Sequence, residues 1–132
     1  ASCLVGSEMC IRDRYYIVDS GIRNYILPKQ SYDSEFMIEN IVYLELLRRK
    51  YIVNIGRNGH TEVDFIAKRN NVYTYIQVTA SLVDENTFNR EIRPLKLIED
   101  NYEKIILTLD RYTLGNYDGI KVINIIDWLL EE

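Results

Sequence analysis

Three strand-like segments joined by tight turns constrain the fold of this 132-residue chain more than any other feature. Strand-forming residues fill positions 51–55, 61–68 and 72–79, and the second segment alternates between apolar and polar residues. Asn58-Gly59 separates the first two segments and Asn70-Asn71 the last two. Both dipeptides accept the positive φ angles of a two-residue turn. The pattern predicts hairpins of antiparallel strands.

Helices are predicted on both sides of these strands. Residues 33–49 predict a largely buried helix, with Asp33 or Ser34 as its N-cap. Residues 86–100 predict a second helix, which Pro94 breaks or kinks in the middle. The remaining segments predict a strand, a turn-rich loop, a strand and a terminal helix, at 104–109, 115–119, 120–125 and 126–130.

The order α-β-β-β-α-β-β-α predicts an α/β fold with a mixed sheet flanked by helices. The length allows a single domain. The formal net charge of −4 excludes a protein that is held to DNA mainly by bulk positive charge. No apolar run approaches the ~18 residues of a membrane span. We therefore expect a globular domain that does not enter a membrane.

Basic residues gather near one end of the predicted hairpins. They are candidates for phosphate contacts, and equally for a solvated rim or a contact to another domain. The set comprises Arg48, Arg49, Lys50, Arg57, Lys68 and Arg69.

The first fourteen residues resemble a laboratory sequence. Residues 4–14 follow, without a gap, one reading frame of a transposase adapter used in sequencing libraries, and the preceding adapter bases also permit Cys3. We expect residues 1–14 to be an artefact of sequence assembly. Cys3 and Cys10 both lie in this segment, so the cysteine count says nothing about redox compartment. We also expect the natural protein to begin further upstream, which makes residues 15–132 a C-terminal fragment.

The second hairpin carries polar residues where a core face is expected. If Asn70-Asn71 is a two-residue turn, paired positions sum to 141, and Asp64 lies opposite Gln77. Glu62 then lies opposite Thr79. Alternation places these four residues on one face, and it places Val63, Phe65, Ile76 and Val78 on the other. Either the polar face is exposed to water or it forms a site.

The first helix carries a carboxylate on its most apolar arc. At 100° per residue, Glu39 falls between apolar positions, which is costly unless a charge, a hydrogen bond or a metal meets it. The alternative is a glutamate near the helix start that extends to solvent. A helix glutamate with a hairpin aspartate is the minimum for a hard divalent cation. His60, the only histidine, falls at a turn and cannot build a His-rich zinc site.

The chain resembles a known family over nearly all of residues 15–132. The matching segments are YYIVDSGIRNYIL at 15–27, ENIVYLELLRR at 39–49, EVDFIA at 62–67, YIQVT at 75–79, REIRPL at 90–95 and NYDGIKVINIIDW at 116–128. They resemble the uncharacterised C-terminal domain of prokaryotic AAA-type ATP-binding proteins. The order αβββαβ, with acids on the first helix and second strand, resembles the PD-(D/E)XK or restriction-endonuclease-like superfamily.

The resemblance implies a nuclease-like site with an altered third motif. Glu39 matches the helix acid, Asp64 the metal-binding aspartate and Gln77 the third-motif ligand, so these three residues would hold Mg²⁺ or Mn²⁺. Thr79 stands where an active nuclease has a lysine that activates water and stabilises charge on the phosphate. Gln77 can alternatively make an amide–carboxylate hydrogen bond with Asp64 and need no metal. We expect a degenerate catalytic site made of Glu39, Asp64, Gln77 and Thr79, with hydrolysis absent or very slow.

The resemblance also implies a context for the domain. Residues 15–32 would link a missing ATPase part to a nuclease-like domain at 33–132. ATP would bind only in the missing part, since the chain has no G-x-x-x-x-G-K-[ST] loop. The partners would be that ATPase domain in cis and DNA, in the cytoplasm, with oligomerisation open. The alternatives are an active Mg²⁺- or Mn²⁺-dependent DNA endonuclease and a structural domain for self-association of the ATPase.

Overall fold

The computed structural model describes Tyr16, residues 34–58 and residues 61–131. Apart from Tyr16, the adapter-like segment, the linker expected at 15–32 and the strand-prone run at 15–18 lie outside the described residues. Asp33 and His60 lie outside them as well. The expectations for these positions stay predictions.

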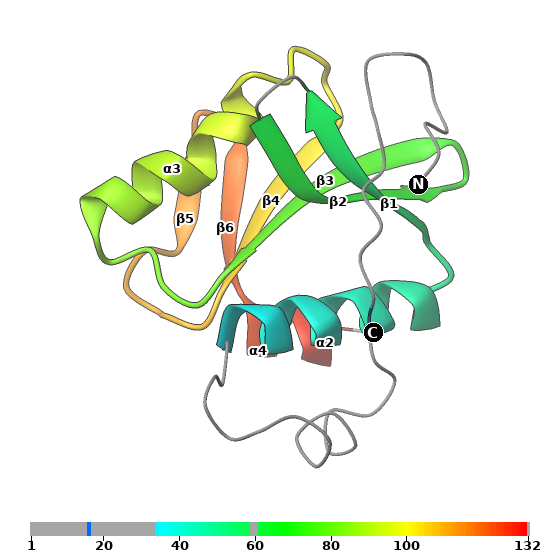
Figure 1. The fold of residues 1–132 in the computed structure, drawn as a ribbon, viewed down its shortest axis with the longest axis horizontal. Coiled ribbons are helices and arrows are strands. Elements are labelled where there is room, and N and C mark those ends of the chain that lie inside the picture. Colours follow the sequence, from blue (N-terminus) through cyan, green and yellow to red (C-terminus); the bar gives the residue numbers. More distant parts are fainter. Residues whose placement is uncertain (1–15, 17–33, 59–60, 132) are drawn as a thin grey trace.

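The described residues form helices and strands close to the predicted ones (Figure 1). In chain order they are α2 (Ser34–Arg48), β1 (Ile52–Asn58), β2 (Thr61–Arg69), β3 (Val72–Thr79), α3 (Glu85–Lys96), β4 (Glu103–Thr108), β5 (Gly115–Tyr117), β6 (Ile120–Asn124) and α4 (Ile125–Leu130).

The strands form one mixed sheet in the order β1-β2-β3-β4-β6-β5. The pairs β1–β2, β2–β3 and β5–β6 are antiparallel, while β3–β4 and β4–β6 are parallel. Helix α3 connects β3 to the parallel strand β4, because parallel neighbours need a crossover connection. The predicted α/β fold with a mixed sheet flanked by helices is confirmed.

The turn between β2 and β3 sets the predicted register. Asn70 and Asn71 have φ angles of 53° and 61°, and Arg69 pairs with Val72. Paired positions therefore sum to 141 along the described ladder, as far as Phe65 and Ile76. Asparagine accepts positive φ more readily than most residues, which explains this dipeptide at the turn.

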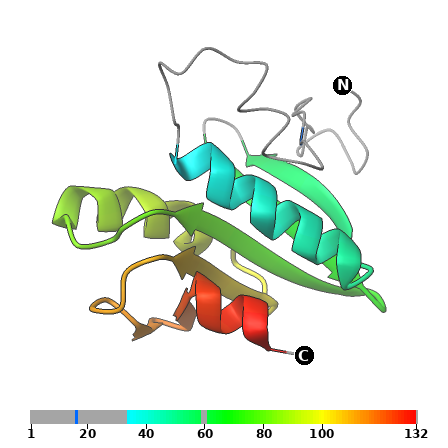
Figure 2. The same cartoon turned by 90° about the horizontal axis from the view of Figure 1, so that it is seen from below.

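Each face of the sheet has its own apolar core (Figures 1 and 2). On one face, α2 and α4 pack over the sheet, and the buried residues are Ile38, Val42, Leu46, Phe65, Ala67, Ile76, Val78, Ile105, Leu107, Ile125 and Trp128. On the other face, α3 packs over the sheet, and the buried residues are Val63, Ile66, Tyr75, Leu82, Ile92, Leu95, Ile106, Ile120 and Val122. The sheet is therefore buried on both sides, as its parallel part requires.

Two predictions about the second half of the chain are wrong. The loop expected at 115–119 contains strand β5, because Asp118 and Gly119 take positive φ and form a turn that pairs Tyr117 with Ile120. Pro94 does not break α3 in the middle. It lies in the last turn of the helix, where a missing N–H costs one bond and leaves most of the helix intact.

Helix α2 is less buried than its composition suggests. Ile38, Val42 and Leu46 are buried, but Ile41 and Leu47 are each more than two-fifths exposed. The prediction of a largely buried helix is therefore wrong for one side. The apolar residues of α2 that are fully buried lie on a stripe with spacing of four residues, as expected for a helix that covers one face of a sheet.

Candidate functional site in the cleft between β2 and α3

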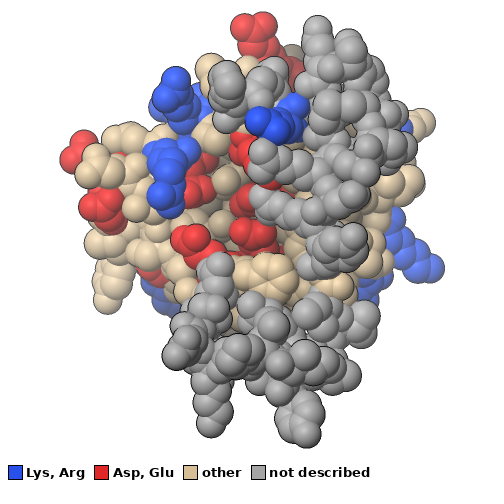
Figure 3. Space-filling view, viewed as in Figure 1, with Lys and Arg blue, Asp and Glu red and all other residues tan. Residues whose placement is uncertain are grey.

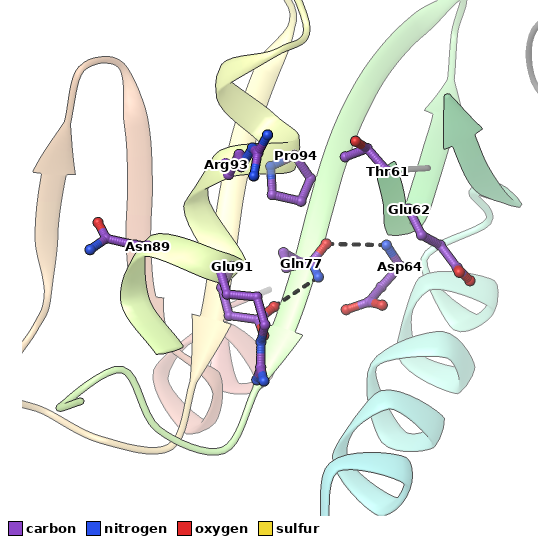
Figure 4. A pocket seen from close by; sticks show the side chains of 9 residues that line it. Thr61, Glu62, Asp64, Gln77, Asn89, Glu91, Arg93 and Pro94 are labelled. Carbon is purple, nitrogen blue, oxygen red and sulfur yellow. Dashed lines mark hydrogen bonds and ion pairs between the residues drawn. The ribbon is translucent and has the colours of Figure 1, made fainter. Parts of the chain in front are cut away.

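A β-bulge changes the direction of side chains at the centre of the site. Asn54 of β1 pairs with Ile66, but Gly56 pairs with Val63, so β2 has one extra residue at Asp64 and Phe65. Val63 consequently packs in the core under α3 instead of beside Phe65. The predicted alternation is wrong for Val63 for this reason, and it is wrong for its neighbour Glu62, whose side chain points away from Gln77 (Figure 4). It is correct for Phe65, Ile76 and Val78, which share the core under α2 and α4.

Side chains replace backbone pairing where β2 and β3 separate. The described ladder ends at Phe65 and Ile76, and beyond it each strand offers an N–H group to a side chain of the other. The Asp64 N–H donates to Gln77 Oε1 over 3.3 Å. The Val78 N–H donates to Asp64 Oδ2 over 2.9 Å. The predicted pairing of Asp64 with Gln77 falls one position beyond the described ladder, where these two side chains bridge the separated strands.

Helix α3 supplies a third member of this group, Glu91. Gln77 Nε2 donates to Glu91 Oε2 over 2.8 Å (Figure 4). Arg90 donates to Glu91 Oε1 over 3.0 Å. The predicted amide–carboxylate bond of Gln77 is therefore made with Glu91 and not with Asp64. Since the Gln77 oxygen also accepts from Asp64, both polar atoms of this side chain have partners.

These residues line a cleft of about 660 Å³ between β2 and α3. Its walls are formed by Thr61, Glu62, Asp64, Gln77, Asn89, Arg90, Glu91, Arg93 and Pro94. Asp64 and Glu91 are only 7% and 8% exposed, so they form the floor, while Arg90 and Arg93 are exposed. Figure 3 shows acidic side chains gathered in the middle of this face, with basic side chains beside them over α3. Two carboxylates, Asp64 and Glu91, lie at the floor and two guanidinium groups at the rim, while the Glu62 side chain points away from Gln77 and Glu91 (Figure 4).

Thr79 is separate from the cleft. It is 1% exposed, it does not line the cleft, and its hydroxyl donates to the Ser81 carbonyl oxygen over 3.3 Å. In the sheet it lies beside Thr108, which in turn lies beside Asn124. All three are buried at the carboxyl ends of β3, β4 and β6.

The loops at this edge of the sheet explain why buried polar residues are needed there. Thr108 Oγ1 contacts the Ala80 carbonyl oxygen at 3.3 Å, and Asn124 Nδ2 donates to the carbonyl oxygens of Leu109 and Asp110. Buried carbonyl groups need such donors, because an unpaired buried polar group is costly. The row that contains Thr79 therefore fixes the loops after β3 and β4.

Glu39 lies on α2, which packs against the face of the sheet opposite α3. Its side chain is half-buried, and it is not among the residues that line the cleft. The structure thus brings Asp64 and Gln77 together in one cleft, with Glu62 at its edge, and it places Glu39 and Thr79 outside the lining. On the same helix, Asn40 is a buried polar residue that the sequence did not single out.

The cleft offers oxygen atoms of the kind that Mg²⁺ and Mn²⁺ prefer. Within residue 16 and the ranges 34–58 and 61–131, no three His, Cys, Asp or Glu side chains converge as a metal site. Gln77 Oε1, one of the three predicted ligands, accepts the Asp64 N–H. A cation bound there would have to displace or share this hydrogen bond. The residues of this cleft therefore fit a metal poorly.

Several of the basic residues near the hairpin ends have partners inside the molecule. Arg49 Nη2 donates to the carbonyl oxygens of Trp128 and Glu131, and its Nε donates to Glu45. The Arg69 guanidinium stacks on the Tyr51 ring, and Lys68 Nζ lies 5.2 Å from the centre of the Tyr73 ring. These contacts favour a structural role over a phosphate site for Arg49, Lys68 and Arg69.

Sequence reasoning missed Glu91, although a signal for it exists. Glu91 follows Phe88 by three residues and precedes Leu95 by four, which places it on the apolar face of α3. The same test that singled out Glu39 on the first helix finds Glu91 on the second. Glu91 is the more deeply buried of the two.

Comparison with known proteins adds one relative. The chain is 42% identical over 118 residues to an uncharacterized protein of Haemophilus influenzae, and the match covers 89% of this chain and 29% of that protein. The chain thus spans less than a third of the length of the curated relative it matches. No family model and no solved structure matches the chain. Among the described residues, no helix combines the length and apolar character needed to cross a bilayer.

Proposed function

We propose that this chain is a nuclease-like accessory domain of a prokaryotic AAA-type ATPase, and that it does not hydrolyse phosphodiester bonds. The order α2-β1-β2-β3-α3-β4 agrees with the αβββαβ core that the family resemblance implies. The hairpin that carries Asp64 and Gln77 has the expected register. These features support the nuclease-like part of the proposal.

The hydrogen bonding of Gln77 is the observation that carries the proposed loss of hydrolysis. The Gln77 amide donates to Glu91 and accepts from the Asp64 N–H, so both polar atoms at the third-motif position already have hydrogen-bond partners within the chain. Thr79, at the position of the expected lysine, is buried and bonded to a loop carbonyl. Neither group supplies the positive charge that stabilises a phosphorane-like transition state.

The charge of the cleft also argues against direct binding of a phosphate. Asp64 and Glu91 would face the phosphate oxygens, and like charges at close range repel strongly where water is partly excluded. Arg90 and Arg93 at the rim are better placed to contact a nucleic-acid backbone or an acidic partner outside the cleft. DNA or partner binding without cleavage is therefore the activity we propose for this face.

A cleavage assay tests the loss of hydrolysis. The 132-residue chain is incubated with supercoiled plasmid and with linear DNA, in the presence of Mg²⁺ or Mn²⁺. We expect no cleavage above the buffer control. The matched variant Asp64→Ala separates this chain from a contaminating nuclease. Cleavage that Asp64→Ala abolishes would overturn the proposal in favour of an active Mg²⁺- or Mn²⁺-dependent endonuclease.

The link to an ATPase rests on the family resemblance, and most of the H. influenzae relative lies outside the match. Amplification and sequencing of the source locus across the codons before Tyr15 tests this link. An upstream reading frame with a G-x-x-x-x-G-K-[ST] loop is the expected result. A start codon directly before Tyr15 would instead indicate a free-standing domain.

A further inference from the structure

A second surface lies where the loop after β4 meets helix α4. It exposes four apolar side chains together with one cation and one anion. We call these residues the α4 patch: Leu109, Arg111, Tyr112, Ile126, Asp127 and Leu130. Tyr112 is 92% exposed and Leu130 is 76% exposed. A single exposed apolar residue is ordinary, but a group of them beside each other marks an interaction surface.

The two parts of the α4 patch are fastened together. The Arg111 guanidinium donates to both carboxylate oxygens of Asp127, at 3.1 and 3.2 Å. Asn124, the N-cap of α4, donates to the Leu109 carbonyl oxygen. The loop and the helix therefore present their exposed side chains as one surface.

Asp110 fixes the loop that carries Tyr112. Its carboxylate accepts from the Leu82 N–H at 2.7 Å and from the Thr113 hydroxyl at 2.6 Å. Partial burial acts to raise the pKa of Asp110, but the hydrogen bonds from Leu82 and Thr113 outweigh it and hold the pKa below its usual value. A fixed loop loses little conformational freedom when its aromatic side chain is buried by a partner. Tyrosines held in this way are frequent anchors of interfaces.

The neighbouring Arg111 and Asp127 make the α4 patch complementary in charge to a second copy of itself. A two-fold axis brings the same surface of two copies together. With Arg111 and Asp127 side by side, that rotation can set Arg111 against Asp127 of the partner subunit, and the reverse. Both side chains are about half exposed, so their present ion pair contributes little and is readily exchanged for a pair between chains.

We propose that the α4 patch is the contact surface between two copies of this chain, with Tyr112 as its aromatic anchor and Arg111 and Asp127 paired across the two-fold axis. This inference does not rest on the proposed function. It concerns a different surface, and it holds whether or not the cleft between β2 and α3 binds DNA.

Sedimentation equilibrium of the 132-residue chain tests the proposal. A reducing buffer is used, because Cys3 and Cys10 could otherwise link two chains. We expect the mass to rise with concentration from 15.6 kDa toward twice that value. Tyr112→Ser should weaken association by about tenfold or more, as for an interface anchor. Val72→Ser, which removes another exposed apolar side chain at the β2–β3 turn, should leave association unchanged.

Mixing two charge variants tests the exchanged ion pairs. Arg111→Asp and Asp127→Arg alone should each be monomeric, since each creates like charges in both the same chain and the partner. Mixed in equal amounts, they should associate, because every pair between the two chains is then opposite in charge. Circular dichroism checks that each variant is folded.

Three results would overturn the proposal. The chain could stay monomeric at about 1 mM, which excludes even weak association. The chain could dimerise with an affinity that Tyr112→Ser does not change. The two charge variants could fail to associate when mixed. In the first case the α4 patch would have to be covered by another protein or by further parts of a longer chain.

Discussion

At the scale of residues, the contact between Gln77 and Glu91 decides the chemistry of the cleft. The neutral Gln77 amide donates a hydrogen bond to the Glu91 carboxylate. Hydrogen bonds to a charged acceptor are stronger than those between two neutral groups. A glutamate at position 77 would instead place two carboxylates at hydrogen-bond distance. The glutamine on β3 and the glutamate on α3 are therefore matched to each other.

Gln77→Glu should lower the free energy of unfolding by about 1–3 kcal/mol at pH 7. Two buried carboxylates would then repel each other, and the hydrogen bond donated by the Gln77 amide would be lost. Urea denaturation at pH 7 measures the difference.

The double variant Gln77→Glu with Glu91→Gln is the control for this prediction. It restores one amide and one carboxylate with their roles exchanged, so it should recover most of the lost stability. An unchanged stability of Gln77→Glu, or a double variant no better than Gln77→Glu alone, would contradict the account of this pair.

Part of this site could be predicted from the sequence. The Asn70-Asn71 turn fixes the register as far as Phe65 and Ile76, and that register brings Asp64 and Gln77 close enough to form a hydrogen bond. The bulge at Asp64 and Phe65 could not be predicted, because it depends on how β1 pairs with β2 and leaves no distinctive residue behind. The hydrogen bond of Thr79 to the loop after β3 could not be predicted for a similar reason, since its surroundings come from β4 and that loop.

At the scale of elements, helix α2 is tied to its surroundings by charged groups at its C-terminal end. Hydrogen bonds from Arg48, together with those from Arg49, lower the pKa of Glu45 to about 2 despite its partial burial. The Glu45–Arg49 pair also holds Arg49 in position for its bonds to α4.

Glu45→Gln should reduce stability by about 1 kcal/mol at pH 7, as expected for partly buried ion pairs on one helix. The pKa of Glu45 is lowered on folding from 4.5 to about 2. The contribution of its charge is therefore complete above pH 4.5 and is lost as the pH falls toward 2. The wild-type chain and the variant should converge in that window, as measured by urea denaturation from pH 7 to pH 2.

Glu99→Gln, an exposed residue outside the helices, serves as the control for Glu45→Gln. It should change stability little at any pH. A difference between wild type and Glu45→Gln that stays constant from pH 7 to pH 2 would argue against the ion pairs as its cause.

Arg49 holds helix α4 against α2. Its guanidinium lies 4.5 Å from the centre of the Trp128 ring and donates to two carbonyl oxygens at the end of α4. Lysine has no planar guanidinium group that could lie over the Trp128 ring and donate to the two carbonyl oxygens at the same time. Arg49→Lys should therefore lower the free energy of unfolding by about 1–2 kcal/mol.

The fluorescence of Trp128, the only tryptophan of the chain, reports the same change. Its spectrum should shift in Arg49→Lys, since the ring loses a cation on its face. Arg48→Lys is the matched control, because Arg48 is the neighbouring residue with a more exposed side chain. An equal effect of the two variants would show that Arg49 has no special role.

Most elements could be predicted, because hydrophobic periodicity and turn residues determine them locally. The boundaries of α2, β3 and β6 agree with the prediction within a residue. Strand β5 was missed although Asp118-Gly119 is a typical hairpin turn, because its three residues have no apolar pattern. The depth of burial along α2 depends on which side the sheet covers, and the sequence does not contain that information by itself.

At the scale of the whole molecule, the sheet separates two surfaces with different chemistry. The cleft between β2 and α3 is polar with a floor of two carboxylates, while the α4 patch is mainly apolar. Each is built on residues whose position is fixed by hydrogen bonds to neighbouring elements. The proposed loss of hydrolysis and the proposed self-association can therefore be tested independently.

Divalent cations should not stabilise the molecule. A ligand that binds only the folded state raises the unfolding temperature in proportion to RT ln(1 + [L]/Kd). Since Gln77 is already bonded on both sides, we expect the same unfolding temperature in about 5 mM Mg²⁺ or Mn²⁺ as in a chelator. Differential scanning fluorimetry measures it. A rise that Asp64→Ala abolishes would reveal a metal site.

The turn at Asn70 and Asn71 has a consequence for how the chain folds. It joins neighbours in sequence, so β2 and β3 can pair after closing only a short loop, within microseconds. The pairing of β3 with β4 has to wait until the intervening helix is in place, because contacts between distant parts of a chain form late. We expect the hairpin of β2 and β3 to be the template on which the parallel half of the sheet assembles.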